Sequence, residues 1–240
     1  MIRHRRIVPR FAVGTLVGVN LVGHVAVTLG DDPEPSPEFL VGCILPDLAT
    51  IARVRLTRPT GEVGRGVEYH HECDAVFHEL PWFLQHTVRL RDELLEGGVD
   101  RGPARASAHA GLEMLLDGAL VDDEYVQSRV RGALDTLDDQ AELLAELAAE
   151  HDRERWVAAV RRIARALDTN GYADPTSITM RLQRMTAGRR RIELRADHTA
   201  AVAAVLERAQ PQVLVAAPGV LATVRDEVTR RTAQPTSAAR

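Results

Sequence analysis

Residues 67–78 read VEYHHECDAVFH, and this stretch decides which architecture we expect. A step of four residues turns an α-helix by only about 40°, so residues four apart lie on one face. His70, Asp74 and His78 therefore form one stripe, with His71 beside it. The stretch predicts a helix that presents imidazole and carboxylate groups together.

A second stretch repeats this pattern further along the chain. His109, Glu113 and Asp117 are again spaced by four residues. Leu112 and Leu115 flank them, so this stripe borders the core rather than open water. Two helices are thus expected to carry polar stripes next to apolar surface.

The composition favours packed helices. The chain has 240 residues, 45% of them hydrophobic and only 4% aromatic, so Ala, Leu and Val must build the core. Strand-like alternation and internal repeats are absent from the sequence. We expect an all-α protein, a single helical bundle over residues 19–231 with additional helices at its C-terminal end.

Charge and residue usage exclude several classes of function. The net charge is -4 and the pI is about 6.1, which argues against a general nucleic-acid binder. The sequence contains no lysine, which excludes Schiff-base chemistry and a lysine general base.

The N-terminal region has two readings. Residues 1–10 are basic and residues 11–30 lack charged side chains, as in a signal peptide or a membrane anchor. We favour a buried first helix over residues 15–29, without stable membrane insertion. Residues 1–18 are then a poorly ordered leader, and residues 232–240 a disordered tail.

The two cysteines indicate a reducing compartment. Cys43 and Cys73 lie in apolar surroundings and match no CxxC pattern. We interpret them as buried thiols in a cytoplasmic protein; a catalytic thiolate is the alternative.

Local signals predict where the helices begin and end. Ser36 followed by Pro37 is typical of a capped helix start. We expect a helix over residues 39–55 with an interruption at Pro46, which lacks an amide donor, and then a flexible loop over residues 56–66, a candidate lid. Further helices are predicted over 67–80, 81–96, 103–121, 123–135, 139–150, 153–168, 176–187, 193–208 and 211–231.

The two polar stripes point to a metal site. Burying many ionisable groups is costly unless they are compensated, and a divalent ion compensates them well. Mixed imidazole and carboxylate ligands suit manganese, iron or zinc. His24 and Asp47 are the expected further ligands. Taken singly, His24 would be a hydrogen-bonded core histidine and His109 a surface partner of Glu113; the joint pattern favours the metal.

Several blocks of sequence resemble a known family. Residues 20–24 read NLVGH and residues 40–47 read LVGCILPD. Together with residues 67–83 and 112–120 they resemble, in order, four blocks of the acyl carrier protein phosphodiesterase family. A weaker likeness extends over residues 185–224.

The resemblance implies a helical fold related to HD-type metal phosphohydrolases. It also implies manganese or magnesium, and hydrolysis of the phosphodiester that joins 4′-phosphopantetheine to acyl carrier protein. The sequence departs from the family at three places. His71 stands where arginine is usual, Gly118 replaces a histidine, and His109 with Glu113 are local additions.

These observations combine into one hypothesis, metal-dependent phosphodiester hydrolysis. Asp74 or Glu113 would take a proton from water, and His71 would protonate the leaving oxygen. Two alternatives stay open: the same scaffold acting on another phosphoester, and a helical binding protein without catalysis. The expected metal ligands are His24, Asp47, His70, Asp74 and Asp117, with His78, His109 and Glu113 in a second metal position or an outer shell.

Overall fold

A computed structural model describes residues 21–31 and 34–233, and within these ranges every regular element is a helix. The all-α class is therefore confirmed. The α-helices are α1 (Leu21–Asp31), α2 (Pro37–Ala52), α3 (Gly61–Glu79), α4 (Pro81–Glu96), α5 (Arg101–Gly118), α6 (Glu124–Asp139), α7 (Ala141–Ala145), α8 (Arg153–Ala166), α9 (Pro175–Thr186) and α10 (Thr199–Ala233). Three short 3-10 helices are η1 (Glu150–Asp152), η2 (Thr169–Ala173) and η3 (Ala196–His198).

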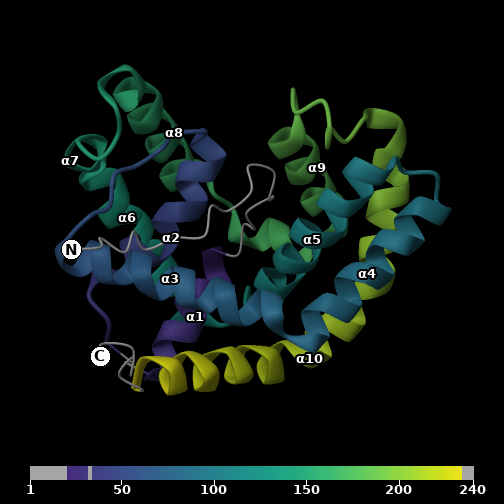
Figure 1. Cartoon of the computed structure of the whole chain (residues 1–240), viewed down its shortest axis with the longest axis horizontal. Helices are drawn as coiled ribbons and strands as arrows, with labels where there is room; N and C mark the ends of the chain where they lie inside the picture. Colours follow the sequence, from purple (N-terminus) through teal and green to yellow (C-terminus); the bar gives the residue numbers. More distant parts are fainter. Residues whose placement is uncertain (1–20, 32–33, 234–240) are drawn as a thin grey trace, which may run out of the picture.

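The helices gather around one buried apolar cluster, to which residues from α1 through α10 contribute. Figure 1 shows α1, α2 and α3 near the centre, with α6, α7 and α8 at one end and α4, α5 and α9 at the other. The long helix α10 runs along the side of α4 and α5 and continues beneath α1 (Figure 1). This arrangement surrounds the polar stripes of α3 and α5 with helices.

Two glycines allow α2 and α3 to approach closely. A Cβ atom at Gly42 would lie 2.2 Å from the Val63 carbonyl oxygen. One at Gly66 would lie 2.1 Å from the Phe39 carbonyl oxygen. Only glycine fits at such a contact between helix backbones. The contact fixes α2 against α3 one helical turn from His70.

The predicted start of α2 is confirmed, but its interruption is wrong. Ser36 caps the helix by accepting a hydrogen bond from the Phe39 amide at 3.2 Å. The helix then continues through Pro46 to Ala52. Proline removes only one hydrogen-bond donor, and the burial of the residues on both sides of Pro46 keeps them helical.

The predicted loop over residues 56–66 is also too long. Helix α3 begins at Gly61, so the connection from α2 covers only residues 53–60. Gly64 and Gly66 lie inside α3 and do not break it. At both positions a Cβ atom would clash with neighbouring backbone. Leu56 in this connection forms an isolated antiparallel bridge with Ala148. Tertiary packing here overrides the low helix propensity of glycine.

Helix α10 joins two helices that the sequence predicted separately. It passes through Pro211 and Pro218, and Figure 1 shows it changing direction along its length. Proline is a usual cause of such bends. The helix ends at Ala233, two residues inside the predicted tail.

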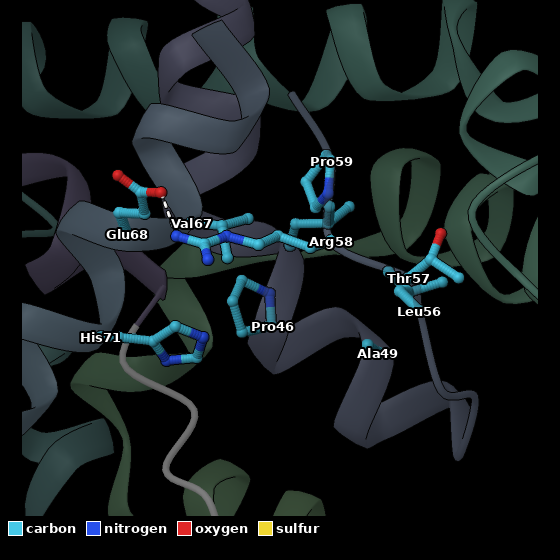
Figure 2. A pocket seen from close by; sticks show the side chains of 10 residues that line it. Pro46, Ala49, Leu56, Thr57, Arg58, Pro59, Val67, Glu68 and His71 are labelled. Atoms are coloured by element: carbon cyan, nitrogen blue, oxygen red, sulfur yellow. Dashed lines mark hydrogen bonds and ion pairs between the residues drawn. The ribbon is translucent and has the colours of Figure 1, made fainter. Parts of the chain in front are cut away.

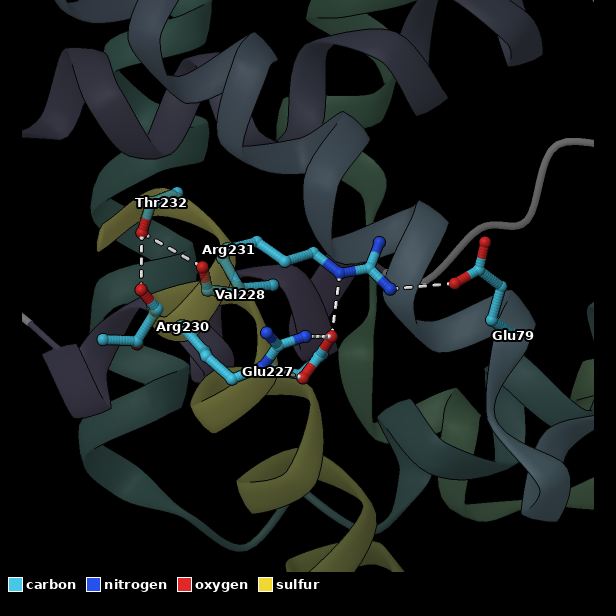
Figure 3. Close-up of polar contacts among 7 residues, drawn as sticks. Glu79, Glu227, Val228, Arg230, Arg231 and Thr232 are labelled. Atoms are coloured by element: carbon cyan, nitrogen blue, oxygen red, sulfur yellow. Dashed lines mark hydrogen bonds and ion pairs between the residues drawn. The ribbon is translucent and has the colours of Figure 1, made fainter. Parts of the chain in front are cut away.

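An ion pair connects the end of α10 to α3, and two more lie within α10 beside it. Arg231 donates a hydrogen bond to Glu79 at 2.8 Å and a second to Glu227 at 2.9 Å. Arg230 also contacts Glu227, at 2.6 Å (Figure 3). These contacts lie on the exposed side of the junction, whereas Val224 and Val228 of α10 face the core.

Two predictions concern residues beyond those described. The leader over residues 1–18 and the last seven positions of the tail fall outside the described ranges, as does the start of the first predicted helix. Among the described helices, none combines the length and apolar character needed to cross a membrane.

Candidate metal centre

Three helices bring potential ligands to one buried point. His24 of α1, Asp47 of α2 and His70 of α3 each offer a ligand atom, and these atoms lie within 4.8 Å of one another. All three side chains are buried. We call these residues the inner group. Its members come from positions far apart in sequence, as expected of a built site rather than of neighbours on one helix.

The inner histidines have a defined orientation. The Nδ1–H of His70 donates a hydrogen bond to the Cys43 carbonyl oxygen at 2.7 Å. The ring of His70 stacks on that of His24, with centroids 4.1 Å apart. Burial, and the nearby charge of His24, lower the pKa of His70 to about 3. His70 is therefore neutral, and its Nε2 carries a lone pair suited to a metal.

Asp74 lies between the two histidines of the inner group. Its Oδ1 is 3.3 Å from the Nε2 of His24, and its Oδ2 is 3.6 Å from the Nε2 of His70. Burial raises the pKa of Asp74, but the hydrogen bond and charge of His24, with the charges of His70 and His78, outweigh it and hold that pKa well below its usual value. Asp74 is thus ionised and faces the same point as the inner group.

Some buried atoms of the inner group lack the partners that burial requires. Within the described part of the chain, neither Asp47 Oδ2 nor His70 Nε2 has a hydrogen-bond partner. Burial raises the pKa of Asp47 well above its usual value. An unpartnered buried carboxylate and imidazole are costly, and a cation between them would satisfy both. The donor atoms present fit a divalent metal.

A second group of ligand atoms lies where α3 faces α5. His78, His109 and Glu113 also converge within 4.8 Å, and we call them the outer group. The Nε2 atoms of His78 and His109 lie 2.9 Å and 3.2 Å from Oε1 of Glu113. Burial raises the pKa of Glu113, but the charges and hydrogen bonds of His109 and His78 outweigh it, and the net shift is downward.

Asp117 supports the inner group without joining it. Its two oxygens accept hydrogen bonds from the amides of Val22, at 3.2 Å, and Gly23, at 2.8 Å. Asp117 therefore caps the first turn of α1, the helix that carries His24. The next residue, Gly118, has no room for a side chain, because a Cβ there would lie 2.2 Å from the Tyr172 carbonyl oxygen. The predicted ligand Asp117 thus holds a ligand-bearing helix in place.

His71 lines a cavity beside α3. It is exposed, and its ring centroid lies 5.4 Å from that of His70. Figure 2 shows His71 and the ion pair between Arg58 and Glu68 at this cavity, whose volume is about 600 Å³. The lining residues are Leu45, Pro46, Ala49, Leu56, Thr57, Arg58, Pro59, Val67, Glu68 and His71.

At two places, consecutive residues of the chain link the cavity to the inner group. Pro46 lines the cavity and Asp47 belongs to the inner group. In the same way His71 lines the cavity and His70 lies in the inner group. The connection predicted as a candidate lid supplies Leu56 to Pro59 to the lining. The cavity and the inner group are therefore adjacent along α2 and α3.

The two predicted stripes meet at the outer group, whereas at the inner group the α3 stripe meets α1 and α2. The row of His70, Asp74 and His78 spans both groups, because each step of four residues advances about 6 Å along the helix. Sequence reasoning missed the Cys43 carbonyl that orients His70. A backbone acceptor leaves no signal in residue identity, so no pattern could have indicated it.

Comparison with protein-family models, with curated proteins and with solved structures finds no match to this chain. The resemblance to acyl carrier protein phosphodiesterases and the HD-like character of the bundle accordingly stay predictions.

Proposed function

We propose that this protein is a metal-dependent phosphodiester hydrolase whose ion binds at the inner group. The observation that carries the proposal is the convergence of His24, Asp47 and His70 on one point, with buried atoms of Asp47 and His70 left unpartnered among the described residues. A purely structural polar network would be expected to satisfy these atoms with hydrogen bonds. Manganese or magnesium is the first choice of ion by resemblance, and iron or zinc also suit these ligands.

The surrounding residues have distinct tasks in the proposed reaction. A divalent ion at this position would polarise a phosphoryl oxygen and acidify water. Asp74 is ionised and 23% exposed, so it can accept a hydrogen bond from the attacking water and orient it. His71 at the cavity is the group proposed to protonate the leaving oxygen. Its neighbour His70, by contrast, is held neutral as a ligand.

The cavity beside His71 is the proposed place for the rest of the substrate. Its walls combine apolar side chains with the Arg58–Glu68 ion pair. A leaving group such as 4′-phosphopantetheine, with an apolar and amide-containing arm, suits such a lining. Acyl carrier protein is therefore the first partner to test, in a cytoplasmic setting that fits the two free, buried cysteines.

The test begins with elemental analysis of the native protein. Turnover of bis(p-nitrophenyl) phosphate and release of 4′-phosphopantetheine from holo carrier protein are then measured with manganese. Asp47→Asn imitates the protonated carboxyl that burial favours at this position without metal. It should fold normally yet lose ion binding and at least about 100-fold in turnover. His151→Ala, on an exposed histidine beside Asp152, is the matched control and should lose nothing.

Full turnover in the chelated wild type, or in both Asp47→Asn and His70→Gln, would refute metal catalysis. Turnover of the chromogenic ester without release from carrier protein would keep the reaction and reassign the substrate to another phosphoester.

A further inference from the structure

We propose that the outer group is a second metal site, separate from the inner group, that takes a zinc-like divalent ion through two imidazoles and one carboxylate. The proposal does not depend on the proposed reaction. It rests on His78, His109 and Glu113, whose ligand atoms converge within 4.8 Å.

Two of the three separations between the ligand atoms match those of a filled site. Zinc bonds of about 2.0–2.2 Å in a tetrahedral arrangement place neighbouring ligand atoms roughly 3.3 Å apart. The Nε2 atoms of His78 and His109 already lie 2.9 Å and 3.2 Å from Oε1 of Glu113. The third separation, between the ligand atoms of the two imidazoles, is no more than 4.8 Å, so small side-chain rotations would accommodate an ion.

The burial of Glu113 gives an independent reason for a cation. Its side chain is 1% exposed, and within the described part of the chain its Oε2 has no hydrogen-bond partner. Oε1 is approached by two imidazoles, so the contacts that the described residues make satisfy only half of the carboxylate. A metal bound to this carboxylate would compensate the charge that burial makes costly.

Aromatic rings hold the two imidazoles in place. The ring of Phe83 lies 5.0 Å from that of His78 and 5.1 Å from that of His109, measured between centroids. The two imidazoles are themselves 4.9 Å apart. Such packing limits their rotation, and ligands fixed before the ion arrives lose little entropy on binding.

The outer group has the exposure of an open site. The side chains of His78 and His109 are 28% and 20% exposed, in contrast to buried Glu113. Two partly exposed histidines beside a buried glutamate leave a fourth position, on the solvent side, for water or a small anion, as in catalytic zinc sites. The inner group is more deeply buried, with His24 at 5% and His70 at 1% exposure.

Asp74 lies one helical turn from each group on α3. It contacts His24 and His70 directly, and its charge also acts on His109. The two sites are thus close enough to interact electrostatically. They share no ligand of their own, because the inner group uses α1, α2 and α3 and the outer group uses α3 and α5.

The competing occupant is a proton. Burial lowers the pKa of His109, but the charge and hydrogen bond of Glu113 and the charge of Asp74 together outweigh burial and leave this pKa raised. A protonated His109 that pairs with Glu113 would also account for the short distance between His109 Nε2 and Glu113 Oε1. Zinc binding requires neutral imidazole, so zinc should displace this proton at neutral pH and fail to do so in acid.

Equilibrium dialysis of the metal-stripped protein against Zn²⁺ separates these occupants. Glu113→Gln and His109→Gln, which preserve side-chain length or volume, should each lose about one zinc per chain or weaken its binding by more than about 100-fold. His24→Gln should lose only the other zinc. His151→Ala should lose neither, because it removes a histidine beside a carboxylate outside both groups. A Co²⁺-loaded sample should show the visible bands of a four-coordinate site, absent from Glu113→Gln.

Equal zinc binding by the wild type, Glu113→Gln and His109→Gln would overturn the second site and assign the outer group to a protonated ion pair. Loss of zinc in these two variants but not in His24→Gln would uphold the second site and show that zinc occupies the outer group alone; the proposed function is then judged separately, by the manganese-dependent turnover described above.

Discussion

Replacing Gly66 by alanine should separate the two helices that build the inner group. The added Cβ would lie 2.1 Å from the Phe39 carbonyl oxygen, 2.8 Å from Gly42 Cα and 2.9 Å from the Cys43 amide nitrogen. All three atoms belong to the backbone of α2, so no flexible side chain can move aside. The helices must part by more than about 1 Å to restore ordinary contacts.

The magnitude follows from two opposing effects. Alanine is favoured over glycine inside a helix by about 1 kcal/mol. Overpacking a close contact costs about 1–3 kcal/mol, and more where backbone must move. Because backbone must move here, we take the upper part of this cost, about 2–3 kcal/mol, and after subtracting the gain expect Gly66→Ala to lower the free energy of unfolding by about 1–2 kcal/mol. Gly132→Ala is the matched control, because Gly132 is also helical and a Cβ there would meet nothing within 4 Å. It should gain up to about 1 kcal/mol.

Urea unfolding of the metal-free protein, followed by helical circular dichroism, measures both variants. Parting α2 from α3 should also stretch the hydrogen bond from His70 Nδ1 to the Cys43 carbonyl, now 2.7 Å. Loss of such an orienting bond typically weakens metal binding 10–100-fold, so Gly66→Ala should bind its inner ion less tightly and Gly132→Ala should not. Equal stability and equal metal affinity of the two variants would refute the close-contact reasoning.

Three further predictions concern individual side chains. Asp117→Ala removes the acceptor for the Val22 and Gly23 amides and should cost about 1–3 kcal/mol; unchanged hydrogen exchange of the α1 amides would contradict the capping role. Burial lowers the pKa of His70 to about 3, from about 6.5 in the unfolded chain. The unfolded state then binds the extra proton, so this stabilisation is complete above about pH 6.5 and is lost as pH falls toward 3, by up to about 1.4 kcal/mol per pH unit. Metal-free His70→Gln should show a flatter decline between pH 6.5 and 5, and an identical slope would disprove the assignment. Arg231→Ala should change stability by less than about 1 kcal/mol in thermal unfolding, because its partner Glu79 is exposed; a larger loss would mean that the contact carries the α10 junction.

The predictions that succeeded depend on local periodicity. The four-residue spacing that placed His70, Asp74 and His78 on one face is a property of any α-helix, and the structure brings this face to the inner and outer groups. The capped start at Ser36 depends on its own neighbours and was equally predictable.

The predictions that failed depend on contacts between distant segments. Pro46 and Gly66 carry unfavourable helix propensities, yet both are helical because α2 and α3 pack tightly against each other. Propensities differ by about 1 kcal/mol for glycine and about 3 kcal/mol for proline. Burial of the surrounding apolar side chains outweighs these propensity differences, and the sequence pattern alone does not reveal which side chains pack against each other.

The amino-acid order by itself determined an all-helical chain and two stripes of potential ligands, because helical geometry is set residue by residue. Only the tertiary structure decided how those stripes are divided. Helix α1 brings His24 onto His70, whereas α5 brings His109 onto His78. Long-range packing also removed water from Asp47 and Asp117 and thereby raised the pKa of each. Which groups converge and which lose their solvent are properties of the folded chain, since both follow from contacts between residues far apart in sequence.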